Sequence, residues 1–142
     1  MARPPSASPV DYAAFHELHH DYYLHYACLR TGDEAAAAQA VEAAFAQLAA
    51  TWPDVLRSAC PAALAWRVLG RTVVIHTDCR RRSALCEIYR RLEGRQADVV
   101  LLRRHLGLSA ETAAGLMGID PSLLYALLRV AERAAPATGT YV

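Results

Sequence analysis

Apolar side chains recur at helical spacing along most of the chain. Between Asp11 and Arg30 they fall at steps of three and four residues, which is the spacing of one face of an α-helix. The residues on this predicted face are Tyr12, Phe15, Leu18, Tyr22, Tyr26 and Leu29. Thr31-Gly32-Asp33 predicts the end of this helix and the start of a second helix, rich in alanine, that continues to about Ala50. The second helix should bury Val41, Phe45 and Leu48.

A third long helix is expected from Ala62 to about Arg82, opened by Pro61 after a break at Trp52-Pro53-Asp54. Its predicted core face includes Leu64, Val68 and Ile75. The helix would end in three consecutive arginines, and positive charge is favourable at a helix C-terminus. Residues 83–93 form a short basic helix or a linker, broken at Gly94. The segment from Gln96 to His105 then supplies Val99, Val100 and Leu102 as further core residues.

The stretch from Gly107 to Arg129 predicts two short helices joined by a tight turn. Ser109 can cap the first helix, and Gly118 can take the left-handed conformation that ends it. Asp120 can cap the second helix, and Pro121 suits its first position. Leu116, Ile119, Leu124 and Leu128 would bury the angle between the helices. This is the plan of a helix-turn-helix, whose second helix can enter the DNA major groove; the alternative is a helical hairpin with no role in DNA binding.

These patterns predict an all-α protein made of two helical units. We expect a disordered leader over residues 1–10, a helical domain over 11–82, an Arg-rich linker over 83–95, a helix-turn-helix domain over 96–134 and a flexible tail over 135–142. The composition agrees, since 54% of the 142 residues are hydrophobic and alanine is abundant.

Charge is distributed unevenly, although the net charge is only +1. Residues 1–75 carry five arginines against seven acids, and residues 76–142 carry ten against seven. The second half is therefore the more basic. No apolar run is long enough to cross a membrane, and the N-terminus lacks the apolar core of a signal peptide. We therefore expect a cytoplasmic protein with reduced cysteines and no membrane partner.

The first helix and the cysteines carry residues suited to other chemistry. His16-Glu17-Leu18-His19-His20 matches the H-E-x-x-H pattern of zinc peptidases, but no third ligand and no substrate-binding sheet accompany it. With His25, these histidines could form a metal-binding or pH-responsive patch, although a solvated helix surface is the expectation. Cys79 and Cys86 could form a redox pair, although structural thiols are favoured. Trp52 and Trp66 are expected in the core rather than as platforms for bases. We expect no enzyme activity, no cofactor and no metal.

Several segments, in order, resemble a bacterial sigma factor of the extracytoplasmic-function type. Residues 15–33 with Val41 and Phe45 resemble the opening helices of the second conserved region of that family, and residues 61–82 resemble its promoter-facing end. Gln96 to Ala134 is similar to the fourth region, which holds the helix-turn-helix. The resemblance covers about residues 12–134. It implies a protein that binds the RNA polymerase core and promoter DNA and catalyses no reaction itself.

The resemblance also assigns roles to residues. The second region would contact the −10 strand through Arg71, Thr72, Arg80, Arg81 and Arg82. The recognition helix would approach the −35 duplex through Pro121, Ser122, Tyr125 and Arg129. RNA polymerase would bind at Glu34, Val41, Glu42 and Phe45.

The recognition helix departs from the family pattern. Leu123, Tyr125 and Leu127 stand where the family usually carries Thr, Lys and Arg, which leaves Arg129 and Arg133 as its cations. This departure supports an alternative, a degenerate sigma-like module that binds a regulator, such as an anti-sigma factor, or a second copy of itself. Its contact surface would consist of Leu123, Leu124, Leu127 and Leu128.

Overall fold

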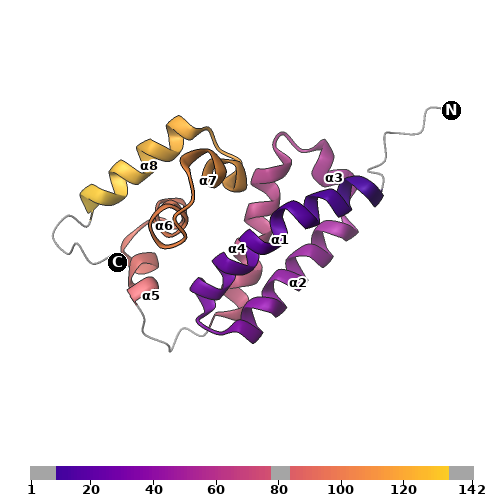
Figure 1. The fold of residues 1–142 in the computed structure, drawn as a ribbon, viewed down its shortest axis with the longest axis horizontal. Helices are drawn as coiled ribbons and strands as arrows, with labels where there is room; N and C mark the ends of the chain where they lie inside the picture. The colour runs from indigo at the N-terminus through magenta and orange to yellow at the C-terminus, as the bar shows by residue number, and fades with distance from the viewer. Residues whose placement is uncertain (1–8, 78–83, 135–142) are drawn as a thin grey trace. The chain divides into compact units, whose positions relative to one another are not determined.

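A computed structural model describes residues 9–77 and 84–134, and it confirms the all-α prediction. The described residues contain helices and no β-strand. The chain divides into two compact units, residues 1–77 and 78–142 (Figure 1). Of the segments expected to lack structure, residues 1–8 and 135–142 lie outside the described residues, whereas Pro9 and Val10 belong to the first helix.

The N-terminal unit contains α1 (Pro9–Thr31), α2 (Glu34–Ala50), α3 (Trp52–Arg57) and α4 (Pro61–His76). The sequence predicted a break where the short helix α3 forms. α2 packs against both α1 and α4, so three long helices share one core (Figure 1).

The turn between α1 and α2 forms as predicted. Gly32 takes a φ of 70°, and Asp33 caps α2 by accepting a hydrogen bond from the Ala35 N–H at 2.9 Å. Both are local signals, because only glycine takes this backbone region readily and a carboxylate satisfies an otherwise unpaired helix donor.

Aromatic side chains fill the core of this unit. Tyr26 and Trp66 have ring centroids 4.5 Å apart, and the rings of Tyr23 and Phe45 stack at 5.4 Å. Trp52 is 5% exposed and Trp66 is 7% exposed, which confirms the expectation that both tryptophans are core residues.

α1 is rotated relative to the prediction. Leu18 is 70% exposed and Tyr22 is 37% exposed, whereas Tyr23 and Ala27 are fully buried. The sequence allowed two phases because Tyr22 and Tyr23 are adjacent. The phase that inserts Tyr23 among Phe45 and the other aromatic rings is the one adopted.

α4 ends earlier than predicted, at His76 rather than near Arg82. Thr77 is extended, and its hydroxyl donates to the Val73 carbonyl at 2.6 Å. The predicted core residue Ile75 is 76% exposed, and the buried side of α4 instead includes Leu69 and Val73. The correction has a simple cause: a residue two positions after Val73 lies on the opposite side of a helix.

The C-terminal unit contains α5 (Ala84–Arg91), α6 (Gly94–Val100), the π-helical turn η1 (Leu101–His105), α7 (Ala110–Met117) and α8 (Pro121–Ala134). α8 packs mainly against α6. The predicted core residues of the lead-in segment are buried: Val99, Val100 and Leu102. No single described helix is long and apolar enough to cross a membrane; α7 and α8 meet that test only together, and they are bent by 99°.

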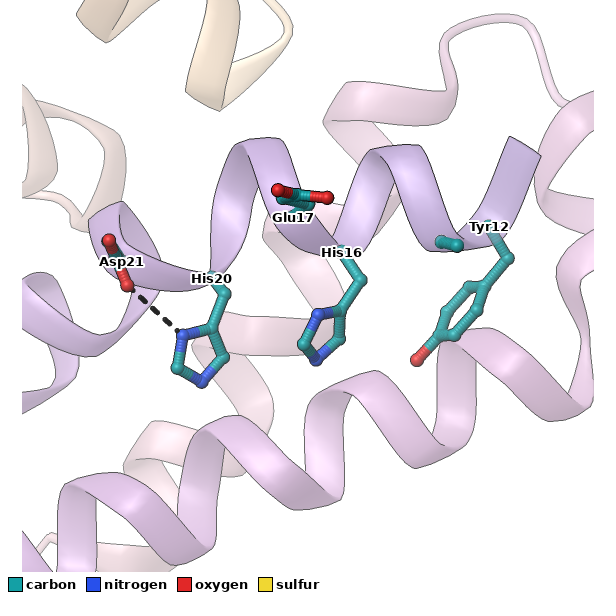
Figure 2. Close-up of a pocket in the computed structure, with 6 residues that line it drawn as sticks. Tyr12, His16, Glu17, His20 and Asp21 are labelled. Carbon is teal, nitrogen blue, oxygen red and sulfur yellow. Dashed lines mark hydrogen bonds and ion pairs between the residues drawn. The ribbon is translucent and has the colours of Figure 1, made fainter. Parts of the chain in front are cut away.

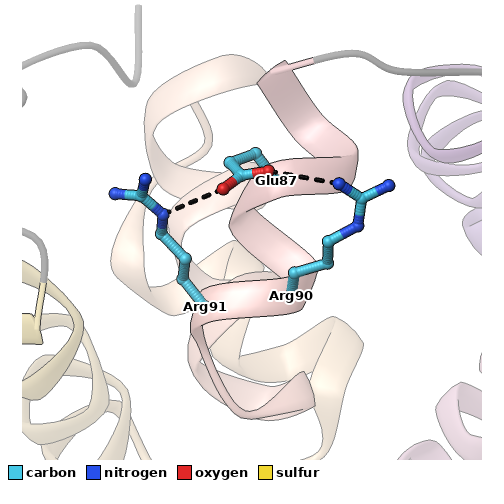
Figure 3. Close-up of polar contacts among 3 residues, drawn as sticks. All are labelled: Glu87, Arg90 and Arg91. Carbon is cyan, nitrogen blue, oxygen red and sulfur yellow. Dashed lines mark hydrogen bonds and ion pairs between the residues drawn. The ribbon is translucent and has the colours of Figure 1, made fainter.

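The segment predicted as a short basic helix or a linker contains the helix α5, so the first of these alternatives is the one adopted. Glu87 forms ion pairs with Arg90 at 3.3 Å and Arg91 at 3.1 Å on the outer surface of this helix (Figure 3). Its other side buries Ile88, followed by Leu92 after the helix ends. The arginines are therefore surface residues of a packed helix.

The buried Tyr23 hydroxyl has no hydrogen-bond partner within the part of the chain that the structure describes. Removing an unsatisfied buried polar group relieves a desolvation penalty. We expect Tyr23→Phe to raise the free energy of unfolding by about 1 kcal/mol. Thermal or urea denaturation followed by circular dichroism measures this change.

Tyr26→Phe is the matched control for Tyr23→Phe. The Tyr26 hydroxyl accepts a hydrogen bond from Arg30 Nη1 at 2.8 Å, so its removal should lower stability. Destabilisation of similar size by both substitutions would show that the Tyr23 hydroxyl is satisfied.

Candidate nucleic-acid interface

The turn between α7 and α8 has the geometry of a helix-turn-helix. Ser109 caps α7, accepting a hydrogen bond from the Thr112 N–H at 3.1 Å. Gly118 ends α7 with φ 70° and ψ 36°, the predicted left-handed conformation. The bend of 99° between the helices falls in the range of about 90–120° found in helix-turn-helix motifs.

Asp120 caps α8 as predicted. Its carboxylate accepts hydrogen bonds from both the backbone N–H and the hydroxyl of Ser122, each at 2.9 Å. These two hydrogen bonds lower the pKa of Asp120, so the cap stays charged to a lower pH than an ordinary aspartate would. Pro121 occupies the first helical position, where its missing N–H costs no hydrogen bond.

One side of α8 lies in the core of the C-terminal unit. Leu124 is fully buried, and Leu127 and Leu128 are 8% and 9% exposed. The predicted apolar docking surface is therefore wrong at three of its four residues, and only Leu123 is exposed. Burial of Leu124 and Leu128 agrees with the separate prediction that they fill the angle between the helices. Leu127 is buried as well because α8 packs against α6, a helix that the sequence pattern did not place beside it.

The opposite side of α8 is open to solvent. It carries the four residues predicted to approach DNA, all of them exposed: Pro121, Ser122, Tyr125 and Arg129. Arg133 continues the same side one turn later, at a spacing of four residues. Glu132 lies close to this surface and forms an ion pair with Arg104 of η1 at 3.2 Å. The negative charge of Glu132 is therefore compensated by Arg104.

The five residues predicted to contact the −10 strand fall into three groups. Arg71 is exposed, as a DNA contact requires. Thr72 is 2% exposed and its hydroxyl donates to the Leu69 carbonyl at 2.9 Å, so the prediction that it contacts DNA is wrong. Arg80, Arg81 and Arg82 lie outside the described residues.

Sequence reasoning missed Arg67, which is also exposed on α4. The signal was available, because Arg67 lies four residues before Arg71 and therefore one turn away on the same side.

The residues predicted to bind polymerase are of two kinds, exposed and buried. Glu34 and Glu42 are exposed on α2. Val41 is 1% exposed and Phe45 is 4% exposed, and both pack in the core of their own unit. The prediction that Val41 and Phe45 bind a partner is therefore wrong.

The histidines of the H-E-x-x-H motif lie beside an open hollow of about 650 Å³ on α1 (Figure 2). The rings of His16 and His20 stack at 5.1 Å, and His16 packs against Phe45 at 4.3 Å. His20 Nδ1 lies 3.3 Å from a carboxylate oxygen of Asp21. His25 is exposed, as expected for a solvated helix surface, whereas His16, His19 and His20 are only partly exposed, with the His20 side chain at 40%.

These histidines were also the predicted candidates for a metal-binding patch. Among the described residues, no three His, Cys, Asp or Glu side chains are grouped to hold a metal ion. The predicted redox pair of Cys79 and Cys86 is not tested, because Cys79 and the side chain of Cys86 lie outside the described residues. Cys28 is half-buried, and burial, with the charge of Glu34, raises the pKa of its thiol.

Comparison with protein-family models, curated proteins and solved structures finds no match to this chain.

Acid should destabilise the protein as the pH falls below 6.5. Burial lowers the pKa of His19, which stacks on Phe15 at 3.9 Å, and burial also lowers the pKa of His105. The unfolded chain therefore binds protons first, at the ordinary pKa of 6.5. Stability is complete above this value and decreases as the pH falls toward the lowered pKa of the folded state.

Urea midpoints between pH 7.5 and pH 5.5, a range of about two units around the pKa of histidine, measure this effect. We expect His19→Gln and His105→Gln each to remove part of the loss. A midpoint that rises in acid would contradict the sign of both shifts.

The cap of α7 can be tested independently. Ser109→Ala removes the acceptor for the Thr112 N–H and should cost about 1 kcal/mol of stability. Ser109→Asp keeps an acceptor and should retain most of the stability. Equal unfolding temperatures for Ser109→Ala and the parent protein would show that the cap contributes nothing.

Proposed function

We propose that this chain is a sigma-like transcription initiation protein that binds the RNA polymerase core and promoter DNA. The observation that carries the proposal is the helix-turn-helix of α7 and α8, with its capped turn and its exposed side holding Ser122, Tyr125 and Arg129. A major groove about 12 Å wide admits one α-helix. The face turned away from the core of the unit is the one able to enter it.

The exposed side of α8 supplies few charges for DNA. Arg129 and Arg133 are cations with no ion pair within the described part of the chain, while Arg104 is compensated by Glu132. Each phosphate neutralised contributes about −0.9 to the slope of log affinity against log salt concentration. Two arginines therefore provide modest affinity, and binding to a promoter would depend on further contacts from polymerase and from the N-terminal unit.

α4 offers the second nucleic-acid contact of the proposal. Arg67 and Arg71 can pair with phosphates, and the exposed Val74 and Ile75 one turn later can contact an unstacked base. An unpaired strand suits such a mixed basic and apolar surface better than a duplex does, because its bases are exposed. The roles of Arg80, Arg81 and Arg82 in the same contact stay a prediction.

Contact with polymerase is assigned to the exposed carboxylates of α2, Glu34 and Glu42. Acidic side chains at an interface steer encounter with a basic partner and fix its orientation. Since Val41 and Phe45 belong to the core, this contact would be mainly electrostatic.

A protein-interaction module without sequence-specific DNA binding is the second candidate. α8 exposes Leu123 and Val130, which are 37% and 46% exposed and share one side of the helix with Ala126. This apolar strip differs from the one that the sequence suggested. It favours a protein partner, such as an anti-sigma factor, over DNA at that side of α8.

The salt dependence of DNA binding separates the two candidates. We expect Arg129→Ala with Arg133→Ala to lower affinity for duplex DNA and to reduce the magnitude of the salt slope by about two units. Fluorescence anisotropy over a salt series measures both quantities. Arg90→Ala with Arg95→Ala, two exposed arginines of the same unit, is the matched control and should leave the slope close to that of the parent protein.

Polymerase binding is tested by retention of the core enzyme on the tagged full-length chain, followed by run-off transcription from genomic fragments. Charge reversal at Glu34 and Glu42 should reduce retention. Failure of the parent chain to retain polymerase would reject the proposal, and absence of DNA binding by the parent chain would favour the second candidate.

A further inference from the structure

α1 carries an exposed surface that we call the acidic face, defined by Glu17, Leu18, Asp21 and Tyr22. Glu17 and Asp21 are one helical turn apart, as are Leu18 and Tyr22, so the four residues form two adjacent rows. Glu17 has no ion pair within the described residues, and the Asp21 side chain is 87% exposed and lies 3.3 Å from His20 Nδ1. An exposed leucine and a partly exposed tyrosine therefore lie next to two carboxylates.

α4 carries an exposed surface of opposite charge, the basic face, defined by Arg67, Arg71, Val74 and Ile75. The spacing of these residues places them on one side of the helix. Val74 is 58% exposed and Ile75 is 76% exposed, and neither arginine has an ion pair in the described ranges 9–77 and 84–134. An exposed isoleucine and valine beside two uncompensated guanidinium groups is unusual for a surface without a partner.

We propose that two copies of this chain associate through these surfaces, with the acidic face of one copy against the basic face of the other. The carboxylates are about 6 Å apart along α1, and the guanidinium groups have the same rise along α4. Arginine forms charge-assisted hydrogen bonds with carboxylates, so the two pairs can be matched one to one. The same contact would also remove the neighbouring apolar side chains from water, which favours association.

The occupant is a second copy because the two faces cannot meet within one chain. α1 and α4 are fixed against each other and against α2 by a shared core, and both faces point away from it. The acidic face and the basic face of a single copy therefore cannot pair with each other, and both stay available to another copy. Charge complementarity is the specific reason for choosing this partner over a protein of unrelated sequence.

This inference stands independently of the proposed function, but it has a consequence for it. The basic face includes Arg71, one of the residues assigned to promoter DNA. A second copy bound there would cover Arg71, so self-association and strand binding would compete.

The test is the mass of the full-length chain in solution, measured by sedimentation velocity over a series of micromolar concentrations. At low salt, about 50 mM, we expect the mass to rise with concentration, and at about 500 mM salt we expect weaker association because the charges are screened. Arg67→Glu with Arg71→Glu should weaken association about tenfold or more, since it makes both faces acidic. Glu17→Arg with Asp21→Arg should do the same by making both faces basic.

Mixing the two charge-reversed variants provides the decisive measurement. Every contact between unlike variants then pairs an acidic with a basic face, so the mixture should associate although neither variant does so alone. Arg90→Glu with Arg95→Glu changes the net charge by the same amount on the other unit and should leave association unchanged. Circular dichroism confirms that these surface variants keep their helices.

Two outcomes would overturn the proposal. A parent chain that stays monomeric across the series at low salt would show that the faces do not pair between copies. Association that persists in both charge-reversed variants would place the contact elsewhere, such as the Leu123 and Val130 strip of α8.

Discussion

The packing of α8 against α6 determines what the C-terminal unit presents to a partner. Leu124, Leu127 and Leu128 are buried in that contact, so the rotation of α8 about its own axis is fixed. The opposite side, with Ser122, Tyr125 and Arg129, is thereby exposed. A rotation of α8 by half a turn would expose the leucines and bury the arginine, which is costly for a charged group without a buried partner. The same contact therefore stabilises the unit and selects its outer surface.

The aromatic core has the same effect in the N-terminal unit. Stacking of Tyr23 on Phe45, and of Tyr26 against Trp66, fixes the rotation of α1 and α4 around α2. Because Tyr23 rather than Tyr22 is inside, Leu18 and Tyr22 are exposed. Because Val73 rather than Ile75 is inside, the end of α4 exposes apolar side chains beside Arg71. Both charged faces of this unit follow from that one core.

Features set by neighbouring residues were predictable from the sequence. The caps at Ser109 and Asp120 and the left-handed Gly118 depend on two or three adjacent positions, and all three are present. The sharp turn between α7 and α8 was predictable for the same reason. The all-α class followed from the spacing of apolar residues over long segments, which a single misjudged position does not alter.

The choice between competing faces was not predictable, because it depends on packing between distant segments. Leu18 and Ile75 fit an apolar repeat, and nothing within their own helices indicates that Tyr23 and Val73 pack better. Leu127 was assigned to an open surface because its partner helix, α6, could not be placed from the sequence. Thr72 was assigned to DNA for its polar side chain, and its bond to the Leu69 carbonyl satisfies that side chain within its own helix.

We propose that the outer side of α8, and not its leucine side, contacts DNA. Titration of the isotopically labelled full-length chain with duplex DNA, followed by NMR, tests this residue by residue. We expect chemical-shift changes concentrated at Ser122, Tyr125 and Arg129, with the methyl groups of Leu124 and Leu128 little affected. Shift changes that avoid α8 altogether at saturating DNA, or that report exposure of its buried leucines, would contradict the claim.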